Sequence, residues 1–222
     1  MKTDLIVIIV ILIINSFSNF IHFKSKEKWF RITRIGINVL CLIYFSFSYG
    51  IIFGPFNILL ILGGIALSFL QVLIYSVIFN KNFKINDLIL LPSSRNESRK
   101  PFFKRHIHNI INSSYEECIY HLAFQSAVYL LSSSIICSII GSVGFFTINH
   151  SKSRKNVIGL MDLALFFIIA SILYAITWSL YLTIAMHIVR NCFIINLQFN
   201  YNGNSRKERY LNIISEKMMN YR

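Results

Sequence analysis

Residues 120–148 read YHLAFQSAVYLLSSSIICSIIGSVGFFTI, a largely apolar run that is interrupted near its middle by Ser132, Ser133 and Ser134. A helix crosses the hydrocarbon core of a bilayer in about 20 residues, so this run is too long for a single span. Consecutive serines between apolar segments favour a turn over a continuous helix. We therefore interpret the run as two membrane helices joined by a short turn.

Apolar runs recur along the chain, and the other four lie at residues 5–23, 35–53, 56–79 and 157–189. The last of these is also too long for one span, and the Thr-Trp-Ser sequence at residues 177–179 predicts a break within it. Hydrophobic residues make up 55% of the 222 residues and charged residues only 14%, a composition typical of integral membrane proteins. The sequence predicts an all-α polytopic membrane protein with about seven transmembrane helices.

The basic residues, which give the chain a formal net charge of +13, are concentrated between the apolar runs. They lie in residues 24–34, 81–105 and 152–155 and from residue 190 onward, whereas the other connections are uncharged. Because cytoplasmic loops carry an excess of Lys and Arg, this pattern predicts seven spans with the N-terminus outside and the C-terminus inside. With five spans, the basic residues 152–155 would face the outside.

Three regions are predicted along the chain. Residues 1–112 contain the N-terminal membrane helices and a basic cytoplasmic loop, in which residues 102–111 predict an interfacial helix. Residues 113–196 form a helical core that carries the polar motifs, and residues 197–222 form a polar cytoplasmic tail. The basic residues form neither a basic helix face nor an aromatic-basic module, so we expect membrane lipids and no nucleic acid among the partners.

Side chains able to carry out chemistry lie in or at the edges of the apolar runs of the second half. They are the pair Glu116 and Glu117, then His150, and then His187 with Asn191 four residues later. Ionisable groups at membrane depth are costly, so a functional role is the first interpretation. A carboxylate pair, two imidazoles and an amide can activate a water and stabilise an oxyanion. Because three predicted helices present them toward the same leaflet, we expect them to converge.

Each of these residues also has a purely structural interpretation. Ser113 and Glu116 fit a capping box, in which a helix would begin at Ser113. His150 suits the C-terminal end of a helix. His187 and Asn191, which share a helix face, can hydrogen-bond to neighbouring helices instead of a substrate.

One further acid, Asp162, lies near the start of the sixth predicted membrane helix. A carboxylate in an apolar run needs a partner or a wet cavity. Asp162 is therefore predicted either to line the cavity formed by the motifs or to pair with Lys155 or Arg154 at the membrane edge.

The three motifs resemble those of the CPBP family of intramembrane proteases, which includes the CAAX prenyl proteases and the bacteriocin self-immunity (Abi) proteins. The family pattern runs Glu-Glu-x-x-x-Arg, Phe-x-x-x-His and His-x-x-x-Asn, and here Glu116, His150 and His187 stand in the same order. Residues 174–180, Tyr-Ala-Ile-Thr-Trp-Ser-Leu, resemble the family's Tyr-x-x-Thr-Gly-Ser-Leu turn. The resemblance covers about residues 116–191.

Two positions depart from the family pattern. His121 stands where the family has Arg, and Trp178 stands where the turn usually has Gly. His121 lies four residues after Glu117, so it can face that carboxylate from the same side of a helix. A histidine is shorter than an arginine and titrates near neutral pH. The resemblance implies that Glu117, with His121, supports the site or tunes its charge.

The remaining site residues take their roles from the resemblance. It implies that Glu116 is the general base that activates a water, which His150 helps to position. It implies that His187 and Asn191 stabilise the tetrahedral oxyanion. A divalent metal is an alternative left open, since Glu116, His150 and His187 could form a zinc site with an open position.

The function implied by the resemblance is that of an intramembrane endopeptidase in a bacterial cytoplasmic membrane. It would cleave a peptide or protein substrate near the cytoplasmic face with a glutamate-activated water. One alternative is a non-catalytic membrane partner or bacteriocin-immunity protein, built on the same scaffold, whose chemistry was lost with the change at His121. Another is a small transport or pore subunit in which the same polar residues line a water path.

Overall fold

The computed structural model describes residues 2–21, 28–50, 53–79, 99–151 and 157–200, and all regular secondary structure in these residues is helical. The helices are α1 (Lys2–Ile21), α2 (Lys28–Tyr49), α3 (Ile58–Phe79), α5 (Arg99–Glu117), the π-helix η1 (Cys118–Gln125), α6 (Ser126–Ser132), α7 (Ile135–Ser151), α8 (Val157–Thr177) and α9 (Leu180–Asn200). The predicted all-α fold is confirmed.

Among the described residues, four helices are long and apolar enough to cross a membrane. The spanning segments are Ile32–Tyr49 in α2, Ile58–Ile78 in α3, Val157–Thr177 in α8 and Leu180–Leu197 in α9. Helix α7 is apolar but shorter. Large apolar side chains are exposed on α2, α3 and α7, as expected for surfaces that meet lipid. These features agree with the prediction of a membrane protein.

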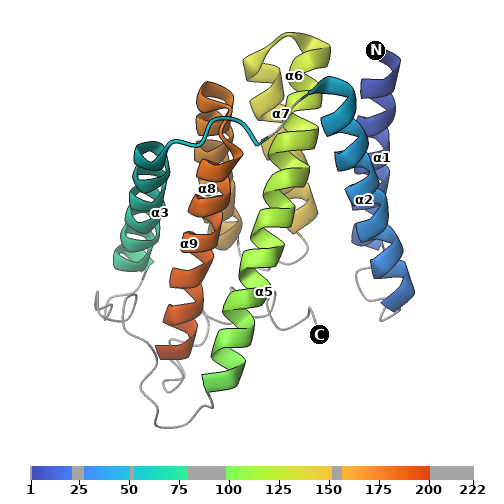
Figure 1. Cartoon of the computed structure of the whole chain (residues 1–222). Coiled ribbons are helices and arrows are strands. Elements are labelled where there is room, and N and C mark those ends of the chain that lie inside the picture. The colour runs from blue at the N-terminus through green and yellow to red at the C-terminus, as the bar shows by residue number, and fades with distance from the viewer. Residues whose placement is uncertain (1, 22–27, 51–52, 80–98, 152–156, 201–222) are drawn as a thin grey trace.

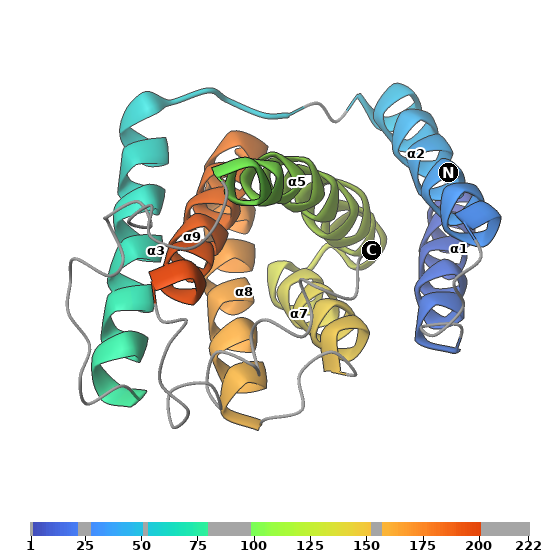
Figure 2. The same cartoon turned by 90° about the horizontal axis from the view of Figure 1, so that it is seen from below.

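The helices run alternately up and down, so that the described turns gather at one end of the molecule (Figure 1). These turns are residues 53–57, between α2 and α3, residues 133–134, between α6 and α7, and residues 178–179, between α8 and α9. None of the three contains a charged residue. Viewed along the bundle, α3, α5, α7, α8 and α9 form one group, and α1 and α2 lie to one side (Figure 2).

The two helix breaks predicted from the sequence are confirmed at residues 133–134 and 178–179. Each break contains a left-handed residue, Ser133 with φ +55° and Trp178 with φ +54°. Glycine adopts this backbone conformation most easily. Trp178 therefore stands at a position whose conformation favours glycine. The Trp178 ring packs against Tyr129 and Tyr174, with centroid distances of 5.2 and 5.7 Å.

The predicted start of a helix at Ser113 is wrong. Helix α5 begins at Arg99 and continues through η1 and α6 to Ser132 without interruption. Ser113 is therefore inside a helix, and its hydroxyl donates to Oδ1 of Asn109 one turn earlier (3.0 Å) instead of capping a helix end. The predicted interfacial helix at residues 102–111 is the first part of this long helix, which also runs across residues 112 and 113.

Polar contacts attach the N-terminal helices to α5. Asn15 on α1 donates from Nδ2 to Oδ1 of Asn38 on α2 (2.5 Å), and Asn38 donates from Nδ2 to the hydroxyl of Tyr115 on α5 (2.6 Å). Hydrogen bonds of this kind join helices in an apolar environment. Because Tyr115 directly precedes Glu116, the α1–α2 pair is anchored beside the predicted site.

The segment between α2 and α3 packs against the turn between α8 and α9. The amide of Leu180 donates to the carbonyl oxygen of Phe53 (2.9 Å). Gly54 has φ +73°, and a Cβ added there would overlap the carbonyl oxygen of Trp178. Both the backbone conformation and the space at this position therefore require glycine.

We expect Gly54→Ala to lower the free energy of unfolding by more than about 1 kcal/mol, because alanine is strained at this φ and its methyl group displaces the turn. Thermal unfolding in detergent measures the change. The matched control is Gly144→Ala in α7, where an added Cβ has no other atom within 4 Å. The control should be neutral or stabilising by about 0.5–1 kcal/mol, because alanine favours a helix interior over glycine. Equal stabilities of the two variants would contradict the prediction.

Candidate active site

The π-helix η1 arranges three buried polar side chains in a column. Glu117 directly precedes η1, and His121 and Gln125 follow at intervals of four residues. The amide of Ser126 reaches back to the carbonyl oxygen of His121, five residues earlier, as in a π-helical turn. Such turns occur within α-helices and are frequent at functional sites. Glu117 and His121 are completely buried, and Gln125 is 2% exposed.

Glu117 lies between two histidines. Its Oε1 is 2.6 Å from Nδ1 of His187 on α9, and its Oε2 is 3.1 Å from Nε2 of His121. A buried carboxylate is costly unless nearby groups compensate its charge. The two imidazoles supply this compensation and fix the position of Glu117.

Glu116 lies where three helices meet. Its Oε2 is 3.6 Å from Nε2 of His150 on α7 and 3.7 Å from Nε2 of His187 on α9. Its side chain is 24% exposed, in contrast to that of Glu117. The two distances are longer than direct hydrogen bonds, and contacts of this length suit a bridging water. The predicted convergence of Glu116, His150 and His187 is thus present in the structure.

Hydrogen bonds at Nδ1 set the orientation of the His150 and His187 rings. Nδ1 of His150 donates to the carbonyl oxygen of Phe146 (2.8 Å), and the rings of these two residues stack at 4.0 Å. Nδ1 of His187 donates to the Glu117 carboxylate. Both rings therefore direct Nε2 toward Glu116, and the structure gives Phe146 of the second motif a role in holding His150.

Asn191 is directed to a different partner. Its Nδ2 donates to the hydroxyl of Ser113 on α5 (3.1 Å), which in turn donates to Asn109. Asn109 donates from Nδ2 to the carbonyl oxygen of Ile188 (3.2 Å). His187 and Asn191 thus hydrogen-bond to different residues, and the bond of Asn191 joins α5 to α9.

Asp162 pairs with Arg190 of α9. Lys155 and Arg154, its predicted partners, lie outside the described residues. Arg190 was assigned to a basic loop by its charge, but it is completely buried within α9. Gln71 on α3 also donates to Asp162 Oδ1 (3.2 Å). The sequence signal for this pair is weak, because it consists only of one acid and one base in two separate apolar runs.

A ring connects this ion pair to the site. The Arg190 guanidinium lies 4.9 Å from the centroid of the Phe166 ring. The same ring is 5.3 Å from the ring of His187. Phe166 therefore lies between the Asp162–Arg190 pair and His187.

Within the described part of the chain, no group of three or more His, Cys, Asp or Glu side chains is arranged to hold a metal ion. In particular, Glu116, His150 and His187 do not form such a group. The zinc alternative stays a prediction, and no step of the mechanism proposed below passes through a metal.

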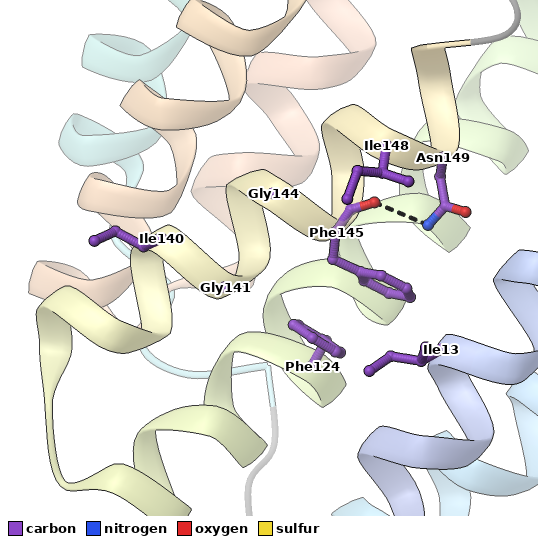
Figure 3. Close-up of a pocket in the computed structure, with 8 residues that line it drawn as sticks. All are labelled: Ile13, Phe124, Ile140, Gly141, Gly144, Phe145, Ile148 and Asn149. Atoms are coloured by element: carbon purple, nitrogen blue, oxygen red, sulfur yellow. Dashed lines mark hydrogen bonds between the residues drawn. The ribbon is translucent and has the colours of Figure 1, made fainter.

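An apolar cavity of about 300 Å³ lies between α1 and α7, away from these groups (Figure 3). Phe124 and Phe145, whose rings stack at 4.2 Å, form part of its lining, and Ile13 faces them from α1. Its polar residue, Asn149, donates from Nδ2 to the Phe145 carbonyl oxygen (2.9 Å). None of the predicted site residues lines it, and its chemistry favours hydrocarbon over water.

Comparison with known proteins identifies no relative of the chain. No protein-family model matches the chain, and neither the curated proteins nor the solved structures contain a significant match. The resemblance to the CPBP proteases therefore depends on the three motifs and on the turn at residues 174–180.

Proposed function

We propose that the protein is an intramembrane endopeptidase of the CPBP type, which hydrolyses a peptide bond with a water activated by Glu116. The observation that carries this proposal is the position of Glu116 Oε2, between Nε2 of His150 and Nε2 of His187. When the His150 ring is neutral, its Nε2 and Oε2 of Glu116 are both hydrogen-bond acceptors. A water at this point supplies the protons that these acceptors need.

In the proposed reaction, the water donates one hydrogen to Glu116 and the other to His150. Glu116 removes a proton as the water oxygen attacks the carbonyl carbon of the substrate, which forms a tetrahedral oxyanion. The protonated Glu116 then gives that proton to the leaving amine, the C–N bond breaks, and a carboxylic acid and an amine are released. His150 keeps the water aligned during the attack.

His187 is proposed to stabilise the oxyanion. With Nδ1 bound to Glu117, the ring can donate from Nε2 in its protonated form, which the buried carboxylate of Glu117 stabilises. Glu117 thereby supports His187 in the way that a carboxylate supports the histidine of a serine protease triad. Asn191 remains the proposed second donor, a role that requires its amide to exchange Ser113 for the oxyanion.

The proposed setting is a bacterial cytoplasmic membrane crossed seven times, with the N-terminus outside and the C-terminus inside. The uncharged turns gather at one end of the bundle (Figure 1), which supports this orientation, because an excess of Lys and Arg marks the cytoplasmic side of a membrane. The substrate is a peptide or membrane-anchored protein that presents its scissile bond near that face.

The proposal is tested by reconstituting the protein in liposomes with candidate peptides and identifying fragments by mass spectrometry. We expect His187→Gln to lower the cleavage rate about 10²- to 10³-fold, since a neutral amide replaces the protonated imidazole that is proposed to stabilise the oxyanion. His108→Gln is the matched control, because His108 is an exposed histidine on α5, and it should cleave like the parent. If neither the parent nor the control cleaves while both bind the same membrane partner, the non-catalytic alternative replaces the protease.

A further inference from the structure

The side chain of Gln125 has only one possible orientation in its surroundings. Its Nε2 is 2.9 Å from the carbonyl oxygen of Ser171 on α8, and only the amide NH₂ group can donate there. Its Oε1 therefore faces Nδ1 of His121 at 2.7 Å. Because an amide oxygen carries no proton, Nδ1 of His121 must be the donor in this hydrogen bond.

The surroundings of Nε2, the other ring nitrogen of His121, then determine how many protons the His121–Glu117 pair carries. Nε2 of His121 lies 3.1 Å from Glu117 Oε2, at ion-pair distance though not aligned as a hydrogen bond. Among the described residues, neither atom has a hydrogen-bond partner, and both are buried. A neutral ring protonated at Nδ1 would place a lone pair against a carboxylate oxygen, which is unfavourable in a buried site. A second proton on Nε2 removes this repulsion and makes the two side chains an ion pair.

Aromatic neighbours hold the plane of the His121 ring. Phe167 stacks on the ring at 4.6 Å with an interplanar angle of 10°, and Tyr174 lies at 5.3 Å with an angle of 24°. The Tyr174 hydroxyl is 2.9 Å from Oγ of Ser126, which donates to the His121 carbonyl oxygen. Stacked aromatic faces also favour a positively charged ring.

We propose that Gln125 is a positioning residue of the site and acts through His121. By keeping Nδ1 of His121 protonated, it leaves Nε2, which lies 3.1 Å from Glu117 Oε2, to carry the second proton of the ring. Glu117 is then anchored at Oε2 by His121, so that its Oε1 can orient His187 toward Glu116. The consequence for cleavage depends on the proposed function, whereas the proton positions do not.

Nuclear magnetic resonance of the ¹⁵N-labelled histidine rings tests the proton positions in the full chain, in detergent. The chain has six histidines, and loss of one ring signal in His121→Asn assigns His121. We expect Nδ1 of His121 to be protonated in the parent and in Gln125→Glu, which preserves an acceptor. In Gln125→Met the amide oxygen that accepts from Nδ1 is missing. We therefore expect Nδ1 to lose its proton and the ring to become a neutral Nε2–H imidazole.

The control is Gln71→Met, which replaces a glutamine that contacts Asp162 and should leave the His121 signals unchanged. An unprotonated Nδ1 in the parent overturns the proposal, even if Gln125→Met does not fold. A protonated Nδ1 in folded Gln125→Met overturns it as well.

Cleavage provides the second measurement. Gln125→Met should slow it about 10²-fold, the scale expected when a reacting group is misplaced, and Gln125→Glu should retain most of the rate. Unchanged cleavage in Gln125→Met would overturn the positioning role. A parent that does not cleave, but shows the expected ring signals, would contradict the protease alone.

Discussion

Glu116→Gln is expected to lower peptide cleavage by about 10²- to 10⁴-fold, the range associated with the loss of a general base. Glutamine preserves the size of the side chain and its contacts with Nε2 of His150 and His187, but its amide cannot take a proton from water. The Glu116 side chain is 24% exposed, so the loss of its charge should leave folding largely intact. The rate is measured in proteoliposomes with the same peptide for the parent and the variant.

Glu117→Gln provides the comparison that separates the two carboxylates. Glu117 is completely buried between two imidazoles, so this variant should lose stability as well as activity. Glu116→Gln should lose activity at nearly unchanged thermal stability. Cleavage at the parental rate in Glu116→Gln would show that Glu116 is not the base.

The helix breaks were predictable because they depend on local features. Polar residues at 132–134 and 177–179 interrupt runs that are too long for one span. A helix was predicted at residues 102–111, but its continuation through Ser113 into η1 was not. The residues from Arg99 to Ser113 are mostly polar, and their helical conformation depends on packing against α9, for example through Asn109 and Ile188. Ser113 and Glu116 match the capping-box pattern in sequence, but this tertiary contact overrides that local preference and no helix begins there.

The convergence of the site was predictable from three motifs at matching depth, since Glu116, His150 and His187 do meet. The direction of each side chain was not. A four-residue spacing places His187 and Asn191 on one helix face, but it does not determine that one side chain turns to Glu117 and the other to Ser113.

Gln125 was also missed, although it continues the four-residue spacing of Glu117 and His121. In a run of apolar residues, a single glutamine does not reveal a partner such as the carbonyl oxygen of Ser171. That contact joins residues that are far apart in the sequence. Local spacing therefore predicted which helices meet at the site, and the long-range contacts fixed the geometry.

Asp162→Asn is expected to lower the free energy of unfolding by about 3–5 kcal/mol, because it leaves the buried guanidinium of Arg190 without its anion. In the described part of the chain, Nε and Nη1 of Arg190 already lack hydrogen-bond partners, so Asp162 is the main compensation for this charge. The hydrogen bond from Gln71 does not replace it, because an amide donor adds no negative charge. Unfolding in a denaturing detergent, followed by the circular dichroism of the helices, measures the change.

The double variant Asp162→Leu with Arg190→Met separates the loss of a charge partner from the loss of packing. Replacement of both members of a buried ion pair by apolar residues is often neutral or stabilising, so the double variant should recover most of the stability that Asp162→Asn loses. The recovery is expected because the Arg190 stem and the Phe166 face already lie in an apolar layer, which methionine can fill. A loss of less than about 1 kcal/mol in Asp162→Asn would place the pair among weak surface ion pairs, contrary to its burial. A double variant no more stable than Asp162→Asn would show that α8 and α9 depend on the polar contacts themselves.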